Sequence, residues 1–295
     1  MKQFLFAATL LGVSLCATAA DADWDAVAKA IGRPGTEAPG GVYRVGIGRS
    51  DLKVTLDDVQ IKPPLALGSY MAFKKVGKQA MVMGDLVLLQ EEVNPVMKKL
   101  IEQGLEVTAI HNHLLRSQPM IMYMHYQGHG DAAKLASAVR AALEESKTPL
   151  EAPAKPASPP QMDLDAPAIE KTLGAKGTNN GGILAFNIPR AETIKAHGTD
   201  LPIGMGMGIV INFQPTGNGK AAITGDYVLT AKEVNPVLKA LRDNGIEVTA
   251  LHSHMLDEQP RLFFMHFWAN DDAQKLARGL RAALDKMNVA QGQAK

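Results

Sequence analysis

The chain has 295 residues, of which 46% are hydrophobic and 21% are charged, and its formal net charge is +1. This length suffices for two domains of ordinary size, each with its own core, and the composition is that of a soluble globular protein. The near-zero net charge leaves no basic excess to hold a phosphate backbone, so we expect no nucleic-acid partner.

Residues 1–19 have the pattern of a secretory signal peptide. An apolar run extends from Phe4 to Ala19, and Ala17 to Ala19 fits a small-x-small cleavage site before Ala20. We therefore expect a periplasmic or secreted protein with no transmembrane segment after cleavage. Lipid anchoring at Cys16 is the alternative, which Leu15 disfavours because a small residue is wanted at that position. Cleavage would also remove Cys16, the one cysteine of the chain, so any metal must be held by histidines and carboxylates.

Residues 20–147 predict a first α+β repeat. Its expected elements are a helix over Trp24–Ile31, strands over Gly41–Gly48 and, more weakly, Leu52–Ile61, and a hairpin of Leu65–Val76 with Gln79–Leu89. A helix with Asn94 as its cap and Pro95 as its first residue follows and ends at Gly104. Two histidine-bearing strands come next, and a helix from Asp131 to about Glu145 completes the repeat.

Residues 148–167 are rich in proline, alanine, serine and lysine, which is typical of an extended linker. Beyond it, residues 168–290 repeat the same order of elements. The strand Gly182–Ile188 corresponds to Gly41–Gly48, and Glu233–Val237 corresponds to Glu92–Val96. We therefore predict a tandem duplication of one α+β unit. Each repeat should form an antiparallel sheet with helices packed on one face, built from ferredoxin-like elements plus extra strands.

The strongest repeated motif is a strand that ends in His-x-His. The segment EVTAIHNH spans Glu106–His113 and EVTALHSH spans Glu247–His254, and a third histidine follows on the next strand of each repeat. Six of the eight histidines occupy these repeated positions, namely His111, His113, His125, His252, His254 and His266. The other two, His129 and His197, have no counterpart in the opposite repeat.

Such a cluster predicts a binding site for a divalent metal ion or a small ligand. Residues two apart on a strand point to the same face and lie roughly 6.5–7 Å apart, so both histidines of His-x-His can reach one ion. Whether His125 shares the face of His111 and His113 depends on a hairpin register that the sequence does not reveal. Three histidines with an open fourth position are the ligand count of catalytic zinc sites, so Zn²⁺ is the first candidate.

Two alternatives remain open for this site. One is a zinc-dependent hydrolase that uses the same histidines, and the other is an envelope interaction module whose histidines are structural. We lean against an enzyme because no general base is placed securely. Asp85 and Asp226 are candidates for a base or a fourth ligand, but nothing in the sequence brings them near the histidines. Glu106 should point away from His111 and His113 if its strand is regular.

Two further features carry weaker hypotheses. Arg49 and Arg190 follow matching strands and could hold an anionic group, although surface ion pairs are the expected role. Gly204–Gly208 alternates glycines within a strand pattern, which indicates a close approach of another backbone or side chain.

Several segments also resemble a known family. These are Val42–Gly48, Ala66–Phe73, Met83–Asp85, Glu92–Pro95 and the His-Asn-His motif, which are similar to those of the LppY/LpqO family. That family consists of exported bacterial proteins built around a domain of unknown function, and its members are often described as lipoproteins. The resemblance covers nearly all of the mature chain, once in each half. It implies export, and it supplies no established catalytic residue or cofactor.

Overall fold

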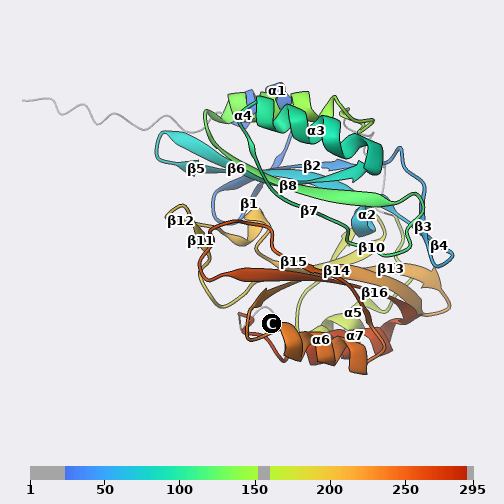
Figure 1. Cartoon of the computed structure of the whole chain (residues 1–295). Coiled ribbons are helices and arrows are strands. Elements are labelled where there is room, and N and C mark those ends of the chain that lie inside the picture. Colours follow the sequence, from blue (N-terminus) through green and yellow to red (C-terminus); the bar gives the residue numbers. More distant parts are fainter. Residues whose placement is uncertain (1–23, 152–159, 291–295) are drawn as a thin grey trace, which may run out of the picture.

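The computed structural model describes residues 24–151 and 160–290, so the expected signal peptide and Cys16 lie outside the described residues. Two similar halves stack as four layers, in the order helices, sheet, sheet, helices (Figure 1). Each of the two large sheets has six strands, and each half of the chain forms one of the sheets. The α+β class, the two repeats and the helices on one face of each sheet are thereby confirmed.

The first half forms the upper two layers of Figure 1. Its elements are α1 (Trp24–Ile31), β1 (Thr36–Ala38), β2 (Val42–Gly48), β3 (Val54–Leu56), β4 (Val59–Ile61), α2 (Pro63–Ala66), β5 (Gly68–Val76), β6 (Gln79–Leu89), α3 (Gln90–Glu102), β7 (Glu106–His111), β8 (Ile121–Gly130) and α4 (Ala132–Leu143). The large sheet has the order β1-β2-β5-β6-β8-β7, and all of its neighbouring strands are antiparallel.

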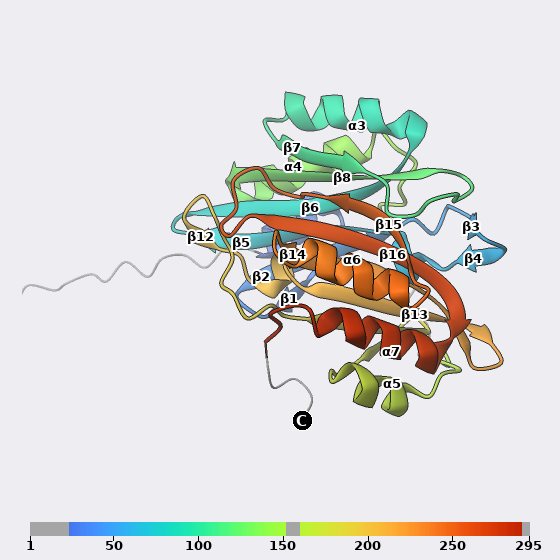
Figure 2. The ribbon, with the colours of Figure 1, turned by 60° about the horizontal axis from the view of Figure 1, so that its bottom comes forward.

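The second half repeats this plan. Its elements are α5 (Ala166–Leu173), β9 (Thr178–Asn180), β10 (Ile183–Ile188), β11 (Lys195–Ala196), β12 (Thr199–Asp200), η1 (Ile203–Met205), β13 (Ile209–Gly217), β14 (Lys220–Thr230), α6 (Val234–Asp243), β15 (Glu247–His252), β16 (Leu262–Asp272) and α7 (Ala273–Leu284). The sheet order β15-β16-β14-β13-β10-β9 matches that of the first half. Figure 2 shows α5, α6 and α7 covering its outer face.

The outer helices form where the sequence is amphipathic and capped. The side chain of Asp131 accepts a hydrogen bond from the backbone N–H of Lys134 at the start of α4, and Asp272 does the same at the start of α7. Such caps satisfy backbone donors that a helix leaves free in its first turn. Leu135, Val139 and Leu143 are buried against the sheet, as their helical spacing predicts.

The start of α3 differs from the prediction. The helix begins at Gln90, so Asn94 and Pro95 lie inside it. The earlier start is stabilised by Glu92, whose carboxylate accepts a hydrogen bond from the backbone N–H of Leu89 at 2.8 Å. An acceptor three residues into a helix closes the first turn, and this signal outweighs the Asn-Pro pair. In the second half α6 begins at Val234, again before its Asn-Pro pair.

Two loop regions also differ from the predicted strands. Leu52–Ile61 is a small hairpin of β3 and β4 rather than one strand, because the backbone reverses at Asp57 and Asp58, which have φ of 46° and 66°. Gly204–Gly208 is not a strand, because its first two residues belong to the short helix η1. The predicted close approach is present, because a methyl group at Gly208 would overlap the side-chain oxygen of Asn187.

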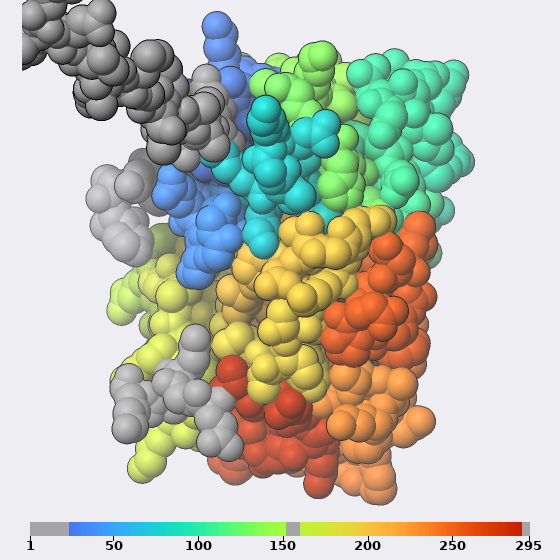
Figure 3. Space-filling model, turned by 90° about the vertical axis from the view of Figure 1, so that its left-hand side faces the viewer, coloured from blue at the N-terminus to red at the C-terminus, as the bar shows by residue number. Residues whose placement is uncertain are grey.

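The inner faces of the two sheets pack on each other. Met81 and Met83 of the first half are buried in the same apolar cluster as the core of the second half. Polar contacts also join the halves, since Arg116 bonds Glu247 and the side chain of Asn212 donates to the Leu65 carbonyl at 3.0 Å. Figure 3 shows the two halves in contact along one side of the molecule.

The boundary between the repeats falls near the expected linker. α5 begins at Ala166, so the last two residues of the predicted linker 148–167 belong to this helix. The exact limits of two domains stay a prediction. Within residues 24–151 and 160–290, no helix is both long and apolar enough to cross a membrane.

Candidate metal centre

The six repeated histidines lie in one cluster between the two sheets. Histidines of one half stack on histidines of the other, with ring centroids 3.5 Å apart for His111 and His252. The corresponding separation is 3.7 Å for His113 with His266 and 3.7 Å for His125 with His254. The duplicated motif therefore builds a joint cluster at the boundary of the repeats.

The register of the β7–β8 hairpin places the three histidines of the first half on one face. His111 lies opposite Tyr123, and Ala109 lies opposite His125. Cross-strand partners share a face, as do residues two apart, so His111 and His125 face the same side. β15 and β16 have the equivalent register, with His252 opposite Phe264. This register was the part that the sequence left undetermined.

A bulge between Val107 and Ala109 changes the position of Glu106. The strand is therefore not regular, and Glu106 lies opposite Gln127, on the same side of the sheet as His125. The expectation that alternation turns Glu106 away was wrong for this reason. Its carboxylate accepts a hydrogen bond from the side chain of Gln127 at 2.8 Å.

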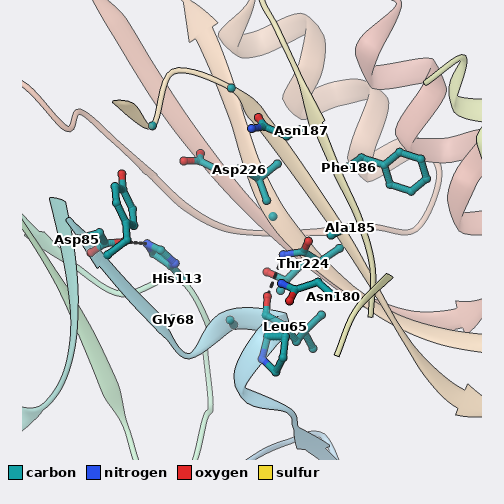
Figure 4. A pocket seen from close by; sticks show the side chains of 18 of the residues that line it. Leu65, Gly68, Asp85, His113, Asn180, Ala185, Phe186, Asn187, Thr224 and Asp226 are labelled. Atoms are coloured by element: carbon teal, nitrogen blue, oxygen red, sulfur yellow. Dashed lines mark hydrogen bonds and ion pairs between the residues drawn. The ribbon is translucent and has the colours of Figure 1, made fainter. Parts of the chain in front are cut away.

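Asp85 and Asp226 complete the cluster. Asp85 on β6 lies opposite His125, and its oxygens are 3.9 Å from His113 Nε2 and 3.8 Å from His125 Nε2. Asp226 on β14 lies opposite His266, with oxygens 3.8 Å from His254 Nε2 and 4.0 Å from His266 Nε2. Figure 4 shows Asp85 beside His113, and Asp226 on the other side of the space between the sheets. The repeated Gly-Asp pair was the signal for both residues.

These distances suit divalent metal ions. Four overlapping groups of three residues have ligand atoms within 4.8 Å of one another: Asp85-His113-His125, Asp226-His254-His266, His111-His113-His266 and His111-His252-His254. Ligand atoms of a tetrahedral zinc ion lie about 3.3 Å apart, given bonds of about 2.0–2.1 Å. The four aspartate–histidine separations of 3.8–4.0 Å exceed this value by about 0.5–0.7 Å. Imidazole and carboxylate donors suit zinc and other first-row divalent ions.

Unpartnered polar atoms support the same fit. The Nε2 atoms of all six histidines are buried without a hydrogen-bond partner, and so is one carboxylate oxygen each of Asp85 and Asp226. Buried side-chain polar atoms usually have a partner, because an unpaired one costs about 1–3 kcal/mol. Bound ions would give all eight of these atoms a partner.

Backbone contacts orient the rings. Nδ1 of His266 lies 2.8 Å from the Gly225 carbonyl oxygen, and His125 is hydrogen-bonded to the backbone of Gly84. A ring whose Nδ1–H donates to a carbonyl has its lone pair on Nε2. The Nε2 atoms of His125 and His266 are thus in the form that binds a metal.

Burial also keeps these rings neutral. It lowers the pKa of His111 to about 3 and that of His252 to about 4, and it lowers the pKa of the other four histidines well below the ordinary value. For Asp85, burial raises the carboxyl pKa to about 8, against the opposing charge of Arg44. The histidines are therefore unprotonated at neutral pH, as metal ligands must be.

A cavity of about 500 Å³ opens beside the cluster. Both aspartates and four of the histidines line it, together with side chains from both sheets and from α2. Figure 4 shows part of this lining, with Asn187 near Asp226 and Thr224 near Asn180.

Arg49 and Arg190 lie outside this site, in buried ion pairs. Arg49 is 0% exposed, and its Nη1 atom is 2.7 Å from Glu92 Oε2. Arg190 pairs with Glu233 at 2.9 Å in the same way. Both arginines form ion pairs, as expected. The expectation that these pairs lie on the surface was wrong, because each guanidinium is enclosed beneath the start of a helix.

The two unrepeated histidines also lie outside the cluster. His129 and His197 meet edge to face with ring centroids 5.0 Å apart. His197 Nδ1 is 3.1 Å from Asp257 Oδ2. Neither histidine belongs to any of the potential metal groups among the described residues.

Both repeats match a protein family whose function is unknown. Residues 25–145 and 167–286 each match the family model of a domain of unknown function, DUF1259. No curated protein matches the chain.

Two solved structures show a distant likeness. One is a trimeric bacterial microcompartment shell protein, PduB, at 13% identity over 85% of this chain and 89% of that chain, with a TM-score of 0.22. The other is EtuB from Clostridium kluyveri, at 11% identity over 85% of this chain and 90% of that chain, with a TM-score of 0.19. Neither likeness is close enough to bear on function.

Proposed function

The chain belongs to the DUF1259 family through both of its repeats, and we propose that it binds divalent transition-metal ions in one centre formed by the two repeats together. Zn²⁺ is the first candidate, because the donors are imidazole nitrogens and carboxylate oxygens. The observation that supports this most strongly is the set of six buried Nε2 atoms without partners.

The geometry favours two ions per chain. One ion would be held by Asp85, His113 and His125, and the other by Asp226, His254 and His266. His111 and His252 stack with ring centroids 3.5 Å apart. His111 lies in groups that contain ligands of both ions and could complete the coordination of either, whereas His252 lies in a group with His254 of the second ion.

The rival role for the histidines is structural packing. A packing histidine in a core would be expected to hydrogen-bond through both ring nitrogens or to expose one of them. Here every Nε2 of the cluster is buried and unpaired, and two carboxylates lie within 4.0 Å. Metal binding accounts for this arrangement, whereas packing leaves it unexplained.

The direct test is elemental analysis of the full mature chain purified without a histidine tag. After dialysis against Zn²⁺ and removal of loosely bound metal, we expect close to two ions per chain. The test is repeated with Mn²⁺, Co²⁺ and Ni²⁺ to rank the metals. A chain that retains no metal at neutral pH would return the histidines to a packing role.

We also propose that the protein acts outside the cytoplasm, as a periplasmic or secreted member of the LppY/LpqO group. This rests on the leader at residues 1–19 and on the sequence resemblance. N-terminal sequencing and intact mass of protein from the native host should place the first residue at Ala20 or within one or two residues of it. A mature chain that begins at a lipid-modified Cys16 would contradict release.

A further inference from the structure

We propose that the cavity beside the metal centre binds one small organic anion, with its carboxylate or phosphate-type head between Arg44 and the metal ions. This inference rests on the proposed metal binding. It adds the class of ligand, the residue that recognises its charge and the number of ligands per chain.

The charges around the cavity require an anion once metal is present. Asp85 and Asp226 are the only carboxylates among its lining residues, and Arg44 and Lys176 are the lining cations. Two divalent ions would outweigh two carboxylates and leave an excess of positive charge, to which Arg44 adds. Uncompensated charge in a partly enclosed site is costly, so an anionic ligand is the natural complement.

Arg44 is held in place without a carboxylate partner. Its guanidinium carbon lies 3.6 Å from the centroid of the Tyr70 ring, and its Nη1 donates to the Gly204 carbonyl at 2.9 Å. No carboxylate oxygen lies within 4.0 Å of its guanidinium in residues 24–151 and 160–290, and its charge acts on Asp85 only at longer range. The second lining cation, Lys176, differs because it pairs with Glu170 at 2.9 Å and its side chain is 69% exposed. A fixed and unpaired guanidinium suits recognition of an oxyanion.

Arg44 has no counterpart in the second repeat, so each chain has one anion-binding position. Arg44 lies opposite Ala72, and Ala185 occupies the equivalent position opposite Asn212. The stacking partner Tyr70 lies opposite Asp85, where the second half has Val210 opposite Asp226. The metal ligands are thus duplicated, whereas the anion-binding residues occur once. One anion per chain is expected, bound in one orientation.

The remaining walls fit an organic body on this anion. They include apolar surface from α2 (Pro63, Pro64 and Ala66) and from Val210. A volume of about 500 Å³ is within the range of small-molecule sites, which are mostly apolar with a few polar groups. A bare inorganic ion would leave most of this surface without contact.

The experiment uses the full mature chain loaded with Co²⁺, whose visible absorption reports on its ligands. Benzoate and phenylphosphonate carry the two head groups on the same apolar body, while acetate and inorganic phosphate lack the body. Calorimetry gives the affinity, and metal content is measured in each sample. We expect one equivalent of benzoate or phenylphosphonate to bind and shift the cobalt spectrum, about tenfold or more tightly than the matching small ion.

The variant Arg44→Met should weaken anion binding about 10- to 100-fold, the effect of losing a charge-assisted hydrogen bond, with metal content unchanged. Arg44→Lys should restore part of the affinity, which also controls for misfolding. Lys176→Met is the matched control and should change the affinity less than about threefold. A chain that binds two metal ions but no anion, or binds it equally in Arg44→Met, overturns this inference alone. A chain without metal overturns the proposed function and this inference with it.

Discussion

His111 of the first repeat stacks on His252 of the second, with ring centroids 3.5 Å apart. These residues occupy matching positions of the duplicated sequence. Replacing each residue by its counterpart in the other repeat converts the pair His113–His266 into the pair His254–His125. The ring centroids are 3.7 Å apart in both pairs. The cluster is therefore a self-complementary contact, like the interface of a twofold dimer within one chain. A single repeat would hold only half of the ligands.

Replacing His111 should affect both metal ions, because this residue belongs to two groups that also contain ligands of each proposed site. Loss of a residue that only hydrogen-bonds to a metal ligand typically weakens metal binding 10- to 100-fold. We expect His111→Ala to weaken the binding of both ions by at least this factor. Asp85→Asn should weaken one ion and leave the second near its original affinity. Equilibrium dialysis with elemental analysis measures both.

His129→Ala is the control for these variants, since His129 lies outside the cluster. It should keep the full metal content. The double variant His113→Ala with His254→Ala should bind almost none, because it removes a ligand from each proposed site. Full occupancy in that double variant would rule out the proposed centre.

Cutting the chain between the repeats should leave them associated. The sheets pack through their inner faces, and Arg116, Glu247 and Asp57 form a charged group that spans both halves. For this test a specific protease site is inserted after Pro156, between the two repeats, and the purified chain is treated with the protease. We expect the cut protein to elute from a sizing column as the uncut protein does, and to keep its metal. Separation into two free halves would show that the repeats are independent.

Much of the fold was predictable because it depends on local patterns. α1 occupies the predicted range Trp24–Ile31, and the β5–β6 hairpin turns where expected. These elements follow from apolar periodicity and turn residues, which act within a few positions. The start of α3 was missed because a side chain, Glu92, closes the first turn while also binding Arg49. That second contact is formed only in the folded chain.

The sequence identified the histidines of the site, but it did not predict that the two sets of three come together in one cluster. The repeated His-x-His motif identified four of the histidines, and the histidine repeated on the following strand identified the other two. That the two clusters merge depends on how the sheets face each other, which no local signal encodes. The addition of Asp85 and Asp226 depends on strand registers between β6 and β8 and between β14 and β16. Arg44 lacked any signal, because its counterpart Ala185 breaks the repeat.

The buried pair of Arg49 and Glu92 should contribute strongly to stability. Both side chains are buried, so removing Arg49 leaves the Glu92 carboxylate without its charged partner, at a cost of about 3–5 kcal/mol. Removing Glu92 still leaves Arg49 paired with Asp51 at 2.9 Å. We therefore expect Arg49→Met to lower the free energy of unfolding by this order in urea titrations, and Glu92→Gln to lower it by less. Replacing Arg49 and Glu92 together by Met and Leu should cost less than Arg49→Met alone. Lys239→Ala, in an exposed pair with Asp243, is the control and should stay within about 0.5 kcal/mol.

The same pair predicts a pH dependence. Burial alone would raise the pKa of Glu92, but hydrogen bonds from Arg49 and from two backbone N–H groups lower it below the ordinary 4.5. A carboxyl with a lowered folded-state pKa contributes its full stability above the unfolded value and loses it as pH falls through the folded value. Wild type should therefore lose stability below about pH 4.5, and Glu92→Gln should lose less over that range. Parallel curves for the two proteins would contradict this role.

Gly84 and Gly225 precede the two aspartate ligands, and their lack of a side chain lets the neighbouring strands approach. A methyl group at Gly84 would overlap the Tyr126 hydroxyl and the Tyr70 carbonyl oxygen, and one at Gly225 would overlap the Val210 carbonyl oxygen. A backbone atom cannot move aside without separating the strands, so Gly84→Ala and Gly225→Ala should each cost about 1–3 kcal/mol. Each should also displace the adjacent aspartate and weaken the binding of one metal ion.

Gly46→Ala on β2 is the matched control, because nothing lies within 4 Å of its added methyl. Thermal unfolding with and without Zn²⁺ measures both effects: the metal should raise the melting temperature of wild type and Gly46→Ala, and raise it less in the other two variants. Equal metal-induced shifts in all four proteins would show that these glycines do not position the ligands.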